Sequence, residues 1–211
     1  MLARSLAPDF LLRERETFLR LGAPAGKIYA AMRLREMMGM KLSTSNQLAP
    51  TTRSLLFVCF GNIMRSPMAA TMMRRELAKR NLATAIQVDS SGLHATPGNL
   101  AHPWALAASR EMNMPLSDHR AQLVTVEQVE QADAIFGMDF QNTAELLSRF
   151  PHAREKIFLL GSWLHQPGAA VEIPDPYFSD QDGTLRCYEL IHQCIRSLAD
   201  ELQAETTHAK A

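Results

Sequence analysis

Residues 54–67, with the sequence SLLFVCFGNIMRSP, decide how this chain folds, because they lead from a strand into a helix. The apolar run 55–58 predicts a buried strand. Behind it, Ser66 is a candidate N-cap and Pro67 suits the first position of a helix. The loop between them gathers backbone N–H groups and the positive end of the helix dipole, which predicts an anion site.

A cysteine and an arginine stand at the two ends of this loop. Helix N-termini and nearby cations lower the pKa of a thiol to about 3.5–7.5, so Cys59 is expected to ionise easily. Arg65 carries a planar guanidinium that can bind two oxygens of one phosphate. The remaining phosphate contacts are expected from the loop itself, at Phe60, Gly61, Asn62, Ile63, Met64 and Ser66.

A thiolate that attacks phosphorus also needs a general acid, which protonates the leaving oxygen, and later a general base, which activates a water. One carboxylic acid can provide both, and Asp175 in the segment 173–177 (IPDPY) is the candidate. The prolines on either side of it stiffen the loop and remove backbone donors. Tyr177 adds an aromatic ring, which suits an acid placed beside a flat substrate group.

The pattern C-x5-R-S-P near the start of a domain, with D-P-Y far downstream, resembles the low-molecular-weight protein tyrosine phosphatases. The resemblance extends over residues 54–202 and includes the segments 88–92 (VDSSG), 118–121 (DHRA) and 137–139 (GMD). It implies a protein-tyrosine-phosphatase, a metal-independent and cysteine-dependent phosphoric monoester hydrolase. Such an enzyme hydrolyses phosphotyrosine through a cysteinyl-phosphate intermediate.

The resemblance also implies a role for each matching residue. Cys59 would be the nucleophile, Arg65 the phosphate clamp, and Asp175 the general acid and then the general base. A supporting hydrogen-bonded network would consist of Asn62, Ser66, Ser90 and His119. The wall against an aromatic substrate would be formed by Tyr177 and Phe178.

Two residues of the loop depart from common family patterns. Many members carry a cysteine just before the loop arginine, where it can form a protective disulfide with the nucleophile, but this chain has Met64. We therefore expect Cys59 to be over-oxidised more easily. Some bacterial relatives that act on phosphoarginine carry a threonine four residues after the nucleophile. The bulkier, apolar Ile63 at that position favours phosphotyrosine.

Two alternative functions remain open at this stage. A thiol-dependent arsenate reductase on the same fold would need Cys187 or Cys194 to reach Cys59. Those two cysteines are seven residues apart on one predicted helix face, where core packing is the preferred interpretation. The other alternative is a phosphotyrosine-binding module without turnover. The six histidines other than His119 are scattered without ligand spacing, so we predict no metal site and no cofactor.

Composition limits the number of domains, the kinds of partner and the cellular compartment that we expect. The 211 residues suit one domain with an appendage, and an apolar fraction of 46% is enough for a core. The formal net charge is zero, which gives no general attraction to nucleic acid. No apolar run approaches the roughly 20 residues of a membrane span. Three cysteines argue against a disulfide framework, and a thiolate nucleophile requires a reducing compartment, so we expect a cytoplasmic location.

Strand and helix patterns alternate along the chain. Strands are predicted at 55–58, 86–88, 134–136 and 157–160, with helices at 67–80, 103–113, 141–150 and 183–203. This alternation predicts an α/β fold of three layers, with a four-stranded parallel sheet flanked by helices and the phosphate-binding loop after the first strand. We divide the chain into a helical N-terminal extension and linker (1–53), a phosphatase domain (54–205) and a tail (206–211).

The extension carries a net charge of +5, against −5 for the rest of the chain. Residues 8–40 are expected to form two short helices broken by the segment 22–26, followed by a linker over 43–54. A non-catalytic appendage is slightly favoured over an anionic-surface binder or a native start at Met40.

The expected partner is a phosphotyrosine protein, for which the resemblance suggests a bacterial tyrosine autokinase. The protein itself is expected to be a monomer or weak dimer.

Overall fold

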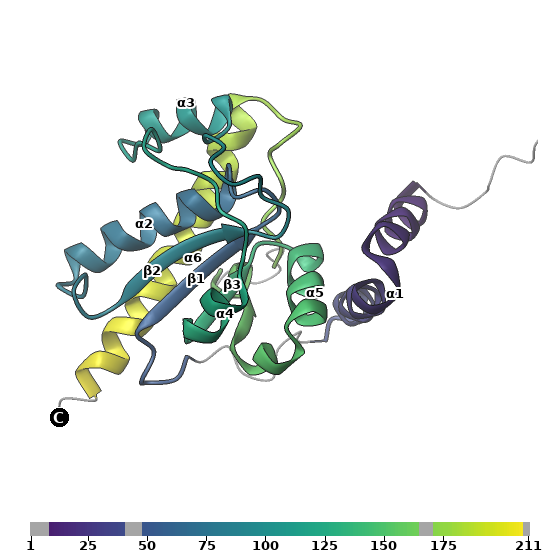
Figure 1. The fold of residues 1–211 in the computed structure, drawn as a ribbon, viewed down its shortest axis with the longest axis horizontal. Coiled ribbons are helices and arrows are strands. Elements are labelled where there is room, and N and C mark those ends of the chain that lie inside the picture. Colours follow the sequence, from purple (N-terminus) through teal and green to yellow (C-terminus); the bar gives the residue numbers. More distant parts are fainter. Residues whose placement is uncertain (1–8, 41–47, 165–170, 209–211) are drawn as a thin grey trace, which may run out of the picture.

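A computed structural model describes residues 9–40, 48–164 and 171–208, so parts of the expected extension, linker and tail lie outside the described residues. Its centre is a four-stranded sheet in the order β2-β1-β3-β4, in which every neighbouring pair is parallel (Figure 1). The strands are β1 (Ser54–Cys59), β2 (Gln87–Gly92), β3 (Ala134–Gly137) and β4 (Ile157–Leu159). The predicted parallel sheet is therefore confirmed.

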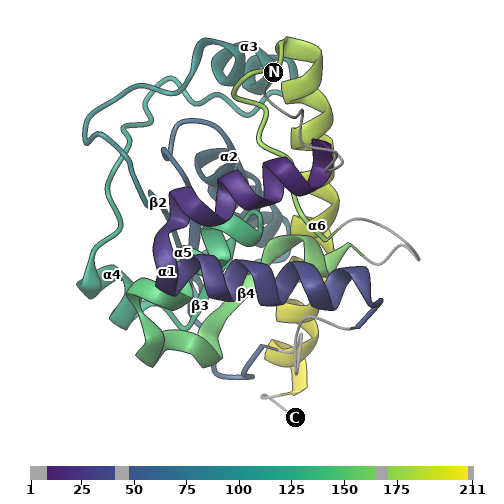
Figure 2. The ribbon, with the colours of Figure 1, turned by 90° about the vertical axis from the view of Figure 1, so that its right-hand side faces the viewer.

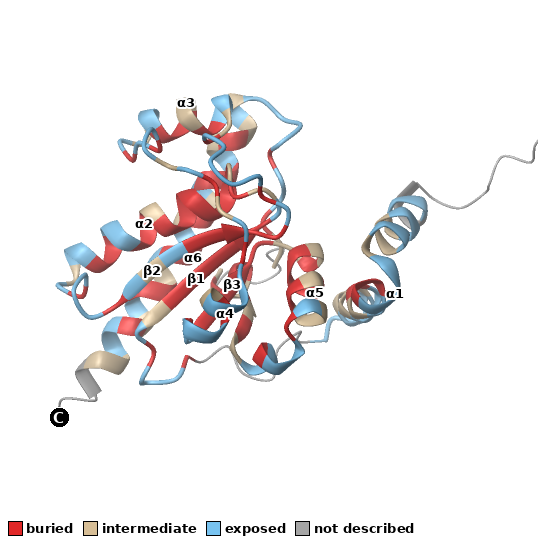
Figure 3. Ribbon diagram, viewed as in Figure 1, coloured by how far each residue is buried: buried red, intermediate tan, exposed pale blue. Residues whose placement is uncertain are grey.

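Helices cover both faces of the sheet, as the alternation of strands and helices predicted. On one face, Phe57 and Phe136 join a core with α2 (Arg65–Lys79), α3 (Pro103–Glu111) and α6 (Gln181–His208). On the other face, Leu56 and Ile135 join a core with α4 (Val126–Gln131) and α5 (Phe140–Arg149). Short 3-10 helices, η1 (Pro151–Lys156) and η2 (Leu160–Trp163), flank β4. Strands β1 and β3 and the inner helix faces are largely buried, whereas the first half of β2 is exposed or intermediate (Figure 3).

Strand β2 is longer than its apolar residues indicated. It continues through Asp89, Ser90 and Ser91, which alternation of hydrophobic residues does not reveal. Both serines are buried, and their hydroxyl groups bond to the side chains of Asn62 and Gln128. The polar residues therefore connect the strand to the loop after β1, through Ser90, and to α4, through Ser91. Helix α6 is also longer than predicted and continues to His208, into the expected tail.

The N-terminal extension is helical. Helix α1 (Asp9–Met37) is broken at Gly22, whose φ of 74° and ψ of 170° are not helical, so it consists of two arms (Figure 2). The predicted break over 22–26 is thus narrower, since Pro24 already lies in the second arm. A Cβ on Gly26 would lie 2.8 Å from the carbonyl oxygen of Phe18, so the arms approach too closely for a larger residue.

Helix α1 packs against α5, outside the layer that α5 forms on the sheet (Figures 1 and 2). Tyr29 is 2% exposed and shares a small apolar cluster with Phe140, Ala144 and Leu159. This contact places the extension beside the carboxyl end of β3. Within the described ranges, no helix is both long enough and apolar enough to span a bilayer.

Candidate active site

The loop after β1 opens at the carboxyl end of the parallel sheet, where ligands bind in open α/β sheets. It lines an open cavity of about 570 Å³. Loop residues Cys59, Phe60, Gly61, Ile63, Met64 and Arg65 share this cavity with Asp175, Tyr177 and Phe178. The structure thus brings together most of the predicted site residues. The other four, Asn62, Ser66, Ser90 and His119, do not line the cavity.

Asn62 organises the loop from beneath. It is fully buried and has a φ of 52°, in the left-handed region that asparagine tolerates better than most residues. Its Nδ2 donates to the hydroxyl groups of Ser66 (2.9 Å) and Ser90 (3.0 Å), and its Oδ1 accepts from the backbone N–H of Gln122 (2.9 Å). The side chain therefore connects the loop to α2, to β2 and to the segment before α4.

His119 supports the same turn from another direction. Its Nε2 lies 2.6 Å from the carbonyl oxygen of Asn62. Burial lowers the pKa of His119, so the neutral imidazole is favoured. Because the carbonyl can only accept, the tautomer that fits this contact carries its proton on Nε2. Both backbone and side-chain groups of Asn62 are consequently held in place.

Ser66 does not have the position that its sequence suggested. Helix α2 begins at Arg65, with Met64 at the N-cap position and no side-chain capping bond, so the prediction of Ser66 as N-cap was wrong. The serine lies inside the first turn, fully buried, with Oγ 3.0 Å from the Cys59 Sγ and 3.2 Å from the carbonyl oxygen of Ser91. Its hydroxyl is engaged by the nucleophile candidate instead of the helix end.

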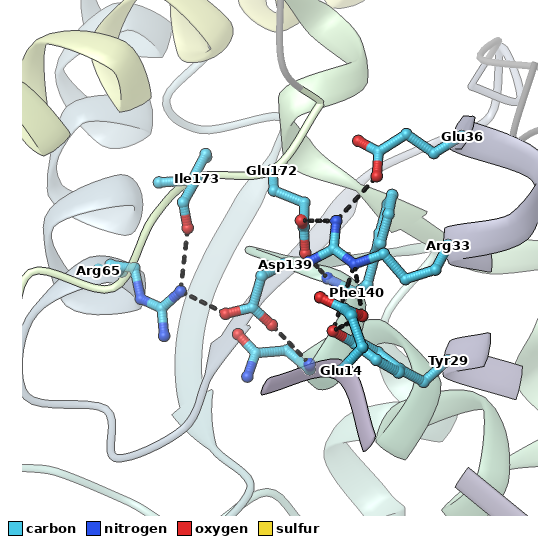
Figure 4. A network of polar contacts seen from close by, with 10 residues as sticks. Glu14, Tyr29, Arg33, Glu36, Arg65, Asp139, Phe140, Glu172 and Ile173 are labelled. Atoms are coloured by element: carbon cyan, nitrogen blue, oxygen red, sulfur yellow. Dashed lines mark hydrogen bonds and ion pairs between the residues drawn. The ribbon is translucent and has the colours of Figure 1, made fainter. Parts of the chain in front are cut away.

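Arg65 is 2% exposed, and its guanidinium pairs with two carboxylates, of which Figure 4 shows that of Asp139. Nη1 donates to Asp139 Oδ2 (2.6 Å) and to the carbonyl oxygen of Ile173 (3.1 Å), while Nη2 donates to Asp175 Oδ2 (2.5 Å). Burial opposes the charge, but Asp139 and Asp175 raise the pKa of Arg65 above its ordinary value. Arg65 therefore stays charged, and it ties the Asp175 loop to the sheet.

Sequence reasoning gave no role to Asp139, although the residue was noted at the end of the third strand. In the structure it caps α5, where its Oδ1 accepts from the backbone N–H of Asn142 (2.7 Å). Its other oxygen pairs with Arg65. The available signal was its place at the carboxyl end of a parallel strand, next to the strand that carries the loop.

Aromatic side chains form the upper walls of the cavity. The Tyr177 ring contacts Phe178 edge to face at 4.9 Å and lies 5.3 Å from the His102 ring. Phe178 is 96% exposed, so it is available to a ligand. The ring of Phe60 stacks on His94 at 4.5 Å and adds a second aromatic group that had been assigned only a phosphate contact. Such walls suit a flat ring held between them.

Asp175 lies at the mouth of this cavity, and its side chain is 45% exposed. Its Oδ1 accepts from the backbone N–H of Tyr177 (3.1 Å). The other oxygen pairs with Arg65, so the carboxylate stands between the loop and the aromatic wall. That position suits proton transfer to an atom bound between loop and wall.

The two cysteines of α6 are buried, and no cysteine of the chain is in a disulfide within the described residues. Burial raises the pKa of both Cys187 and Cys194 to about 12. The Cys187 thiol donates to the carbonyl oxygen of Pro174 (3.5 Å). Thiols that stay protonated and enclosed make poor redox partners, so this environment does not favour an arsenate-reductase relay.

Comparison with known proteins identifies the family. A family model described as low molecular weight phosphotyrosine protein phosphatase matches residues 54–208. The chain belongs to this family. It is accordingly an enzyme of the protein-tyrosine-phosphatase class. The low molecular weight protein-tyrosine-phosphatase Etp of Escherichia coli K12 is 30% identical over 149 residues, which cover 71% of this chain and 94% of Etp.

Solved structures of phosphatases have the same fold. The tyrosine phosphatase Wzb from Escherichia coli K30, in complex with sulphate, superposes with a TM-score of 0.64 at 30% identity, covering 72% of this chain and 99% of that one. The YwlE arginine phosphatase from Geobacillus stearothermophilus gives 0.65 at 27% identity, with 74% and 96% covered. Helix α1 precedes the residues that the family model matches.

Proposed function

We propose that this protein hydrolyses phosphotyrosine in proteins, with Cys59 as nucleophile, Arg65 as phosphate clamp and Asp175 as general acid and base. The observation that carries the proposal is the convergence of these three side chains on one cavity with aromatic walls. The loop that joins Cys59 to Arg65 follows β1 and leads into α2, so its N–H groups suit phosphate oxygens. Family membership supports the reaction class.

In the first step, the Cys59 sulfur attacks phosphorus, and an S–P bond forms as the bond from phosphorus to the tyrosine oxygen breaks. Asp175 gives its proton to the departing phenolate oxygen. A bound phosphate would replace Asp175 on one arm of Arg65, which frees the carboxyl group for this task. The loop N–H groups and Arg65 balance the charge on the phosphoryl oxygens.

In the second step, water attacks the phosphorus of the cysteinyl phosphate. Asp175, now ionised, accepts a proton from the water, the S–P bond breaks, and inorganic phosphate leaves. The Ser66 hydroxyl lies 3.0 Å from the sulfur and can donate to it as the thiolate is regenerated. Asn62 and His119 keep the loop in shape through both steps without contacting the reacting atoms.

Phosphotyrosine is preferred to phosphoarginine on two grounds. Ile63 lines the cavity with an apolar side chain, which offers no hydrogen bond to a guanidinium. Tyr177, Phe178 and Phe60 line the cavity with aromatic rings, which suit a phenyl group. The likeness to an arginine phosphatase makes phosphoarginine the comparison to include in any test.

The substrate is proposed to be a phosphotyrosine protein, with a tyrosine autokinase as the first partner to examine. A reducing, cytoplasmic compartment is proposed because the reaction depends on a free thiol at Cys59. No metal or cofactor takes part in the proposed chemistry, since Arg65 and the loop N–H groups provide the positive charge. We propose a monomer or weak dimer as the working state.

The proposal is tested by hydrolysis of matched phosphotyrosine, phosphoserine and phosphoarginine peptides in the presence of a chelator. Wild type should release phosphate from phosphotyrosine alone, Cys59→Ser should be inactive, and Asp175→Ala should be slower by about 10²–10⁴-fold, as expected for a lost general acid. Folding of each variant is checked by circular dichroism. Binding of phosphotyrosine without turnover by wild type would instead indicate a silent binding module.

A further inference from the structure

The N-terminal extension contributes a basic side chain to the cavity. Arg20, on the first arm of α1, lines it together with Gln141 and Asn142 at the start of α5. The Nη2 of Arg20 donates to Gln141 Oε1. Because the family model begins at residue 54, this arginine belongs to no part of the matched phosphatase domain.

The extension is attached by partly buried contacts close to the site. Arg33 pairs with Glu172 (Nη1 to Oε2, 2.6 Å), and its guanidinium lies 4.7 Å from the centre of the Phe140 ring. Glu172 in turn accepts from the backbone N–H of Phe140 (2.7 Å). Figure 4 shows this cluster next to the Arg65–Asp139 pair. The second arm of α1 is therefore fixed to the residues that flank Asp139 and Asp175.

The carboxylates of Glu14 and Glu36 complete the cluster around Arg33. Glu14 accepts from the Tyr29 hydroxyl (2.7 Å) and from the Arg33 Nε (3.1 Å), and Glu36 accepts from Nη1 (2.8 Å). Glu14 lies on the first arm, whereas Arg33 lies on the second. This bond therefore holds the two arms together and fixes the arm that carries Arg20.

The basic side chains that line the cavity differ in whether they are paired with a carboxylate. Arg65 pairs with two carboxylates, those of Asp139 and Asp175, and His94 contacts Glu145. Arg20 is exposed and contacts the neutral amide of Gln141, and among the described residues it forms no ion pair. A peptide whose phosphotyrosine occupies the loop would thus meet one uncompensated positive charge on the wall formed by α1 and α5.

We propose that Arg20 forms a substrate-selecting subsite, which binds a carboxylate of an aspartate or glutamate close to the phosphotyrosine of the substrate. The inference rests on the proposed function for the place of the phosphate. It gives the extension a role in substrate choice, which is compatible with the non-catalytic appendage expected from its sequence. Arg20 selects between substrates and takes no part in the bond-breaking steps.

The test measures the affinity of phosphotyrosine peptides for protein that carries Cys59→Ser, so that no turnover is needed. The peptides differ only in having aspartate, asparagine or lysine at successive positions on each side of the phosphotyrosine. At low salt we expect at least one aspartate position to bind roughly threefold more tightly than its asparagine counterpart, as for a partly exposed ion pair. The preference should shrink at high salt.

Adding Arg20→Ala should abolish this preference, and Arg20→Glu should reverse it in favour of lysine. Arg15→Ala is the matched control, since Arg15 is an exposed arginine of the same helix that does not line the cavity. The inference is overturned if Arg20→Glu keeps the aspartate preference, or if it weakens all peptides equally, which would indicate a phosphate contact. Wild-type turnover is assayed separately, so failure of the proposed hydrolysis would be recognised as a different result.

Discussion

Replacing Asn62 by alanine tests whether the loop is held in shape by its buried network. The change removes three hydrogen bonds of the side chain, to Ser66, Ser90 and the backbone of Gln122. Each is expected to contribute about 1 kcal/mol to the free energy of unfolding. Alanine at a φ of 52° adds about 1 kcal/mol of backbone strain. The expected loss for Asn62→Ala is therefore about 4 kcal/mol.

The chain offers a matched control for the strain. Asn81 has a φ of 57°, is exposed, and lies in the turn after α2. Its backbone N–H bonds to the carbonyl oxygen of Ala78, at the opposite end of α2 from the loop. Asn81→Ala should cost only the strain, about 1 kcal/mol. Urea unfolding of both variants gives the two values, and the difference between them isolates the network. Turnover of p-nitrophenyl phosphate should fall strongly in Asn62→Ala and stay near wild type in Asn81→Ala.

The reasoning is refuted if Asn62→Ala loses no more stability than Asn81→Ala. It is also refuted if Asn62→Ala unfolds earlier but retains full turnover, because the network would then stabilise the fold without shaping the loop. Assays are made well below the unfolding midpoint of each variant, so that loss of activity does not simply report unfolded protein.

Two further predictions concern packing and pH. A Cβ at Gly92 would lie 2.8 Å from backbone atoms of Asn62 and Phe60. Gly92→Ala should therefore displace the loop, lower the free energy of unfolding by about 1–3 kcal/mol in a urea titration, and reduce kcat. Gly61→Ala, whose Cβ would have its nearest contact at 3.5 Å, should keep wild-type stability in the same titration. For Glu76, burial raises the pKa, but hydrogen bonds from two basic neighbours outweigh it and lower the pKa to about 2. Glu76→Gln should therefore lower the free energy of unfolding by about 3 kcal/mol at pH 7. The difference from wild type should vanish as the pH falls from about 4.5 towards 2. A difference that stays constant across that pH range would contradict the assignment.

Local patterns were enough to predict the loop and its neighbours. The apolar run before Cys59 predicted a strand and Pro67 a helix, and β1 and α2 lie there, but α2 begins at Arg65, so Pro67 is its third residue and not the first as predicted. The prediction of Ser66 as N-cap was wrong because local propensity carries no information on contacts between side chains in the fold. Here the Ser66 hydroxyl contacts the thiol of Cys59. Hydrophobic alternation did not reveal the polar end of β2; the family resemblance placed Ser90 in a network with Asn62, and the two side chains are hydrogen-bonded.

Long-range contacts explain what sequence reasoning could not supply. Arg20 enters the cavity only because α1 packs on α5, and that contact depends on Arg33 and Glu172, residues far apart in the chain. No periodicity in residues 8–40 specifies which surface the extension covers. The role of Asp139 likewise follows from sheet order, which places the end of β3 beside the end of β1.

The most direct test of the central claim is to look for the phosphoryl group on the enzyme. Wild type is mixed with a phosphotyrosine peptide, quenched rapidly, digested and examined by mass spectrometry, with Cys59→Ser treated in parallel. The account predicts a transient phosphoryl group on Cys59 that appears during turnover and decays as phosphate is released. Turnover with no phosphoryl group on Cys59 at any quench time, or turnover that persists in Cys59→Ser, would contradict it.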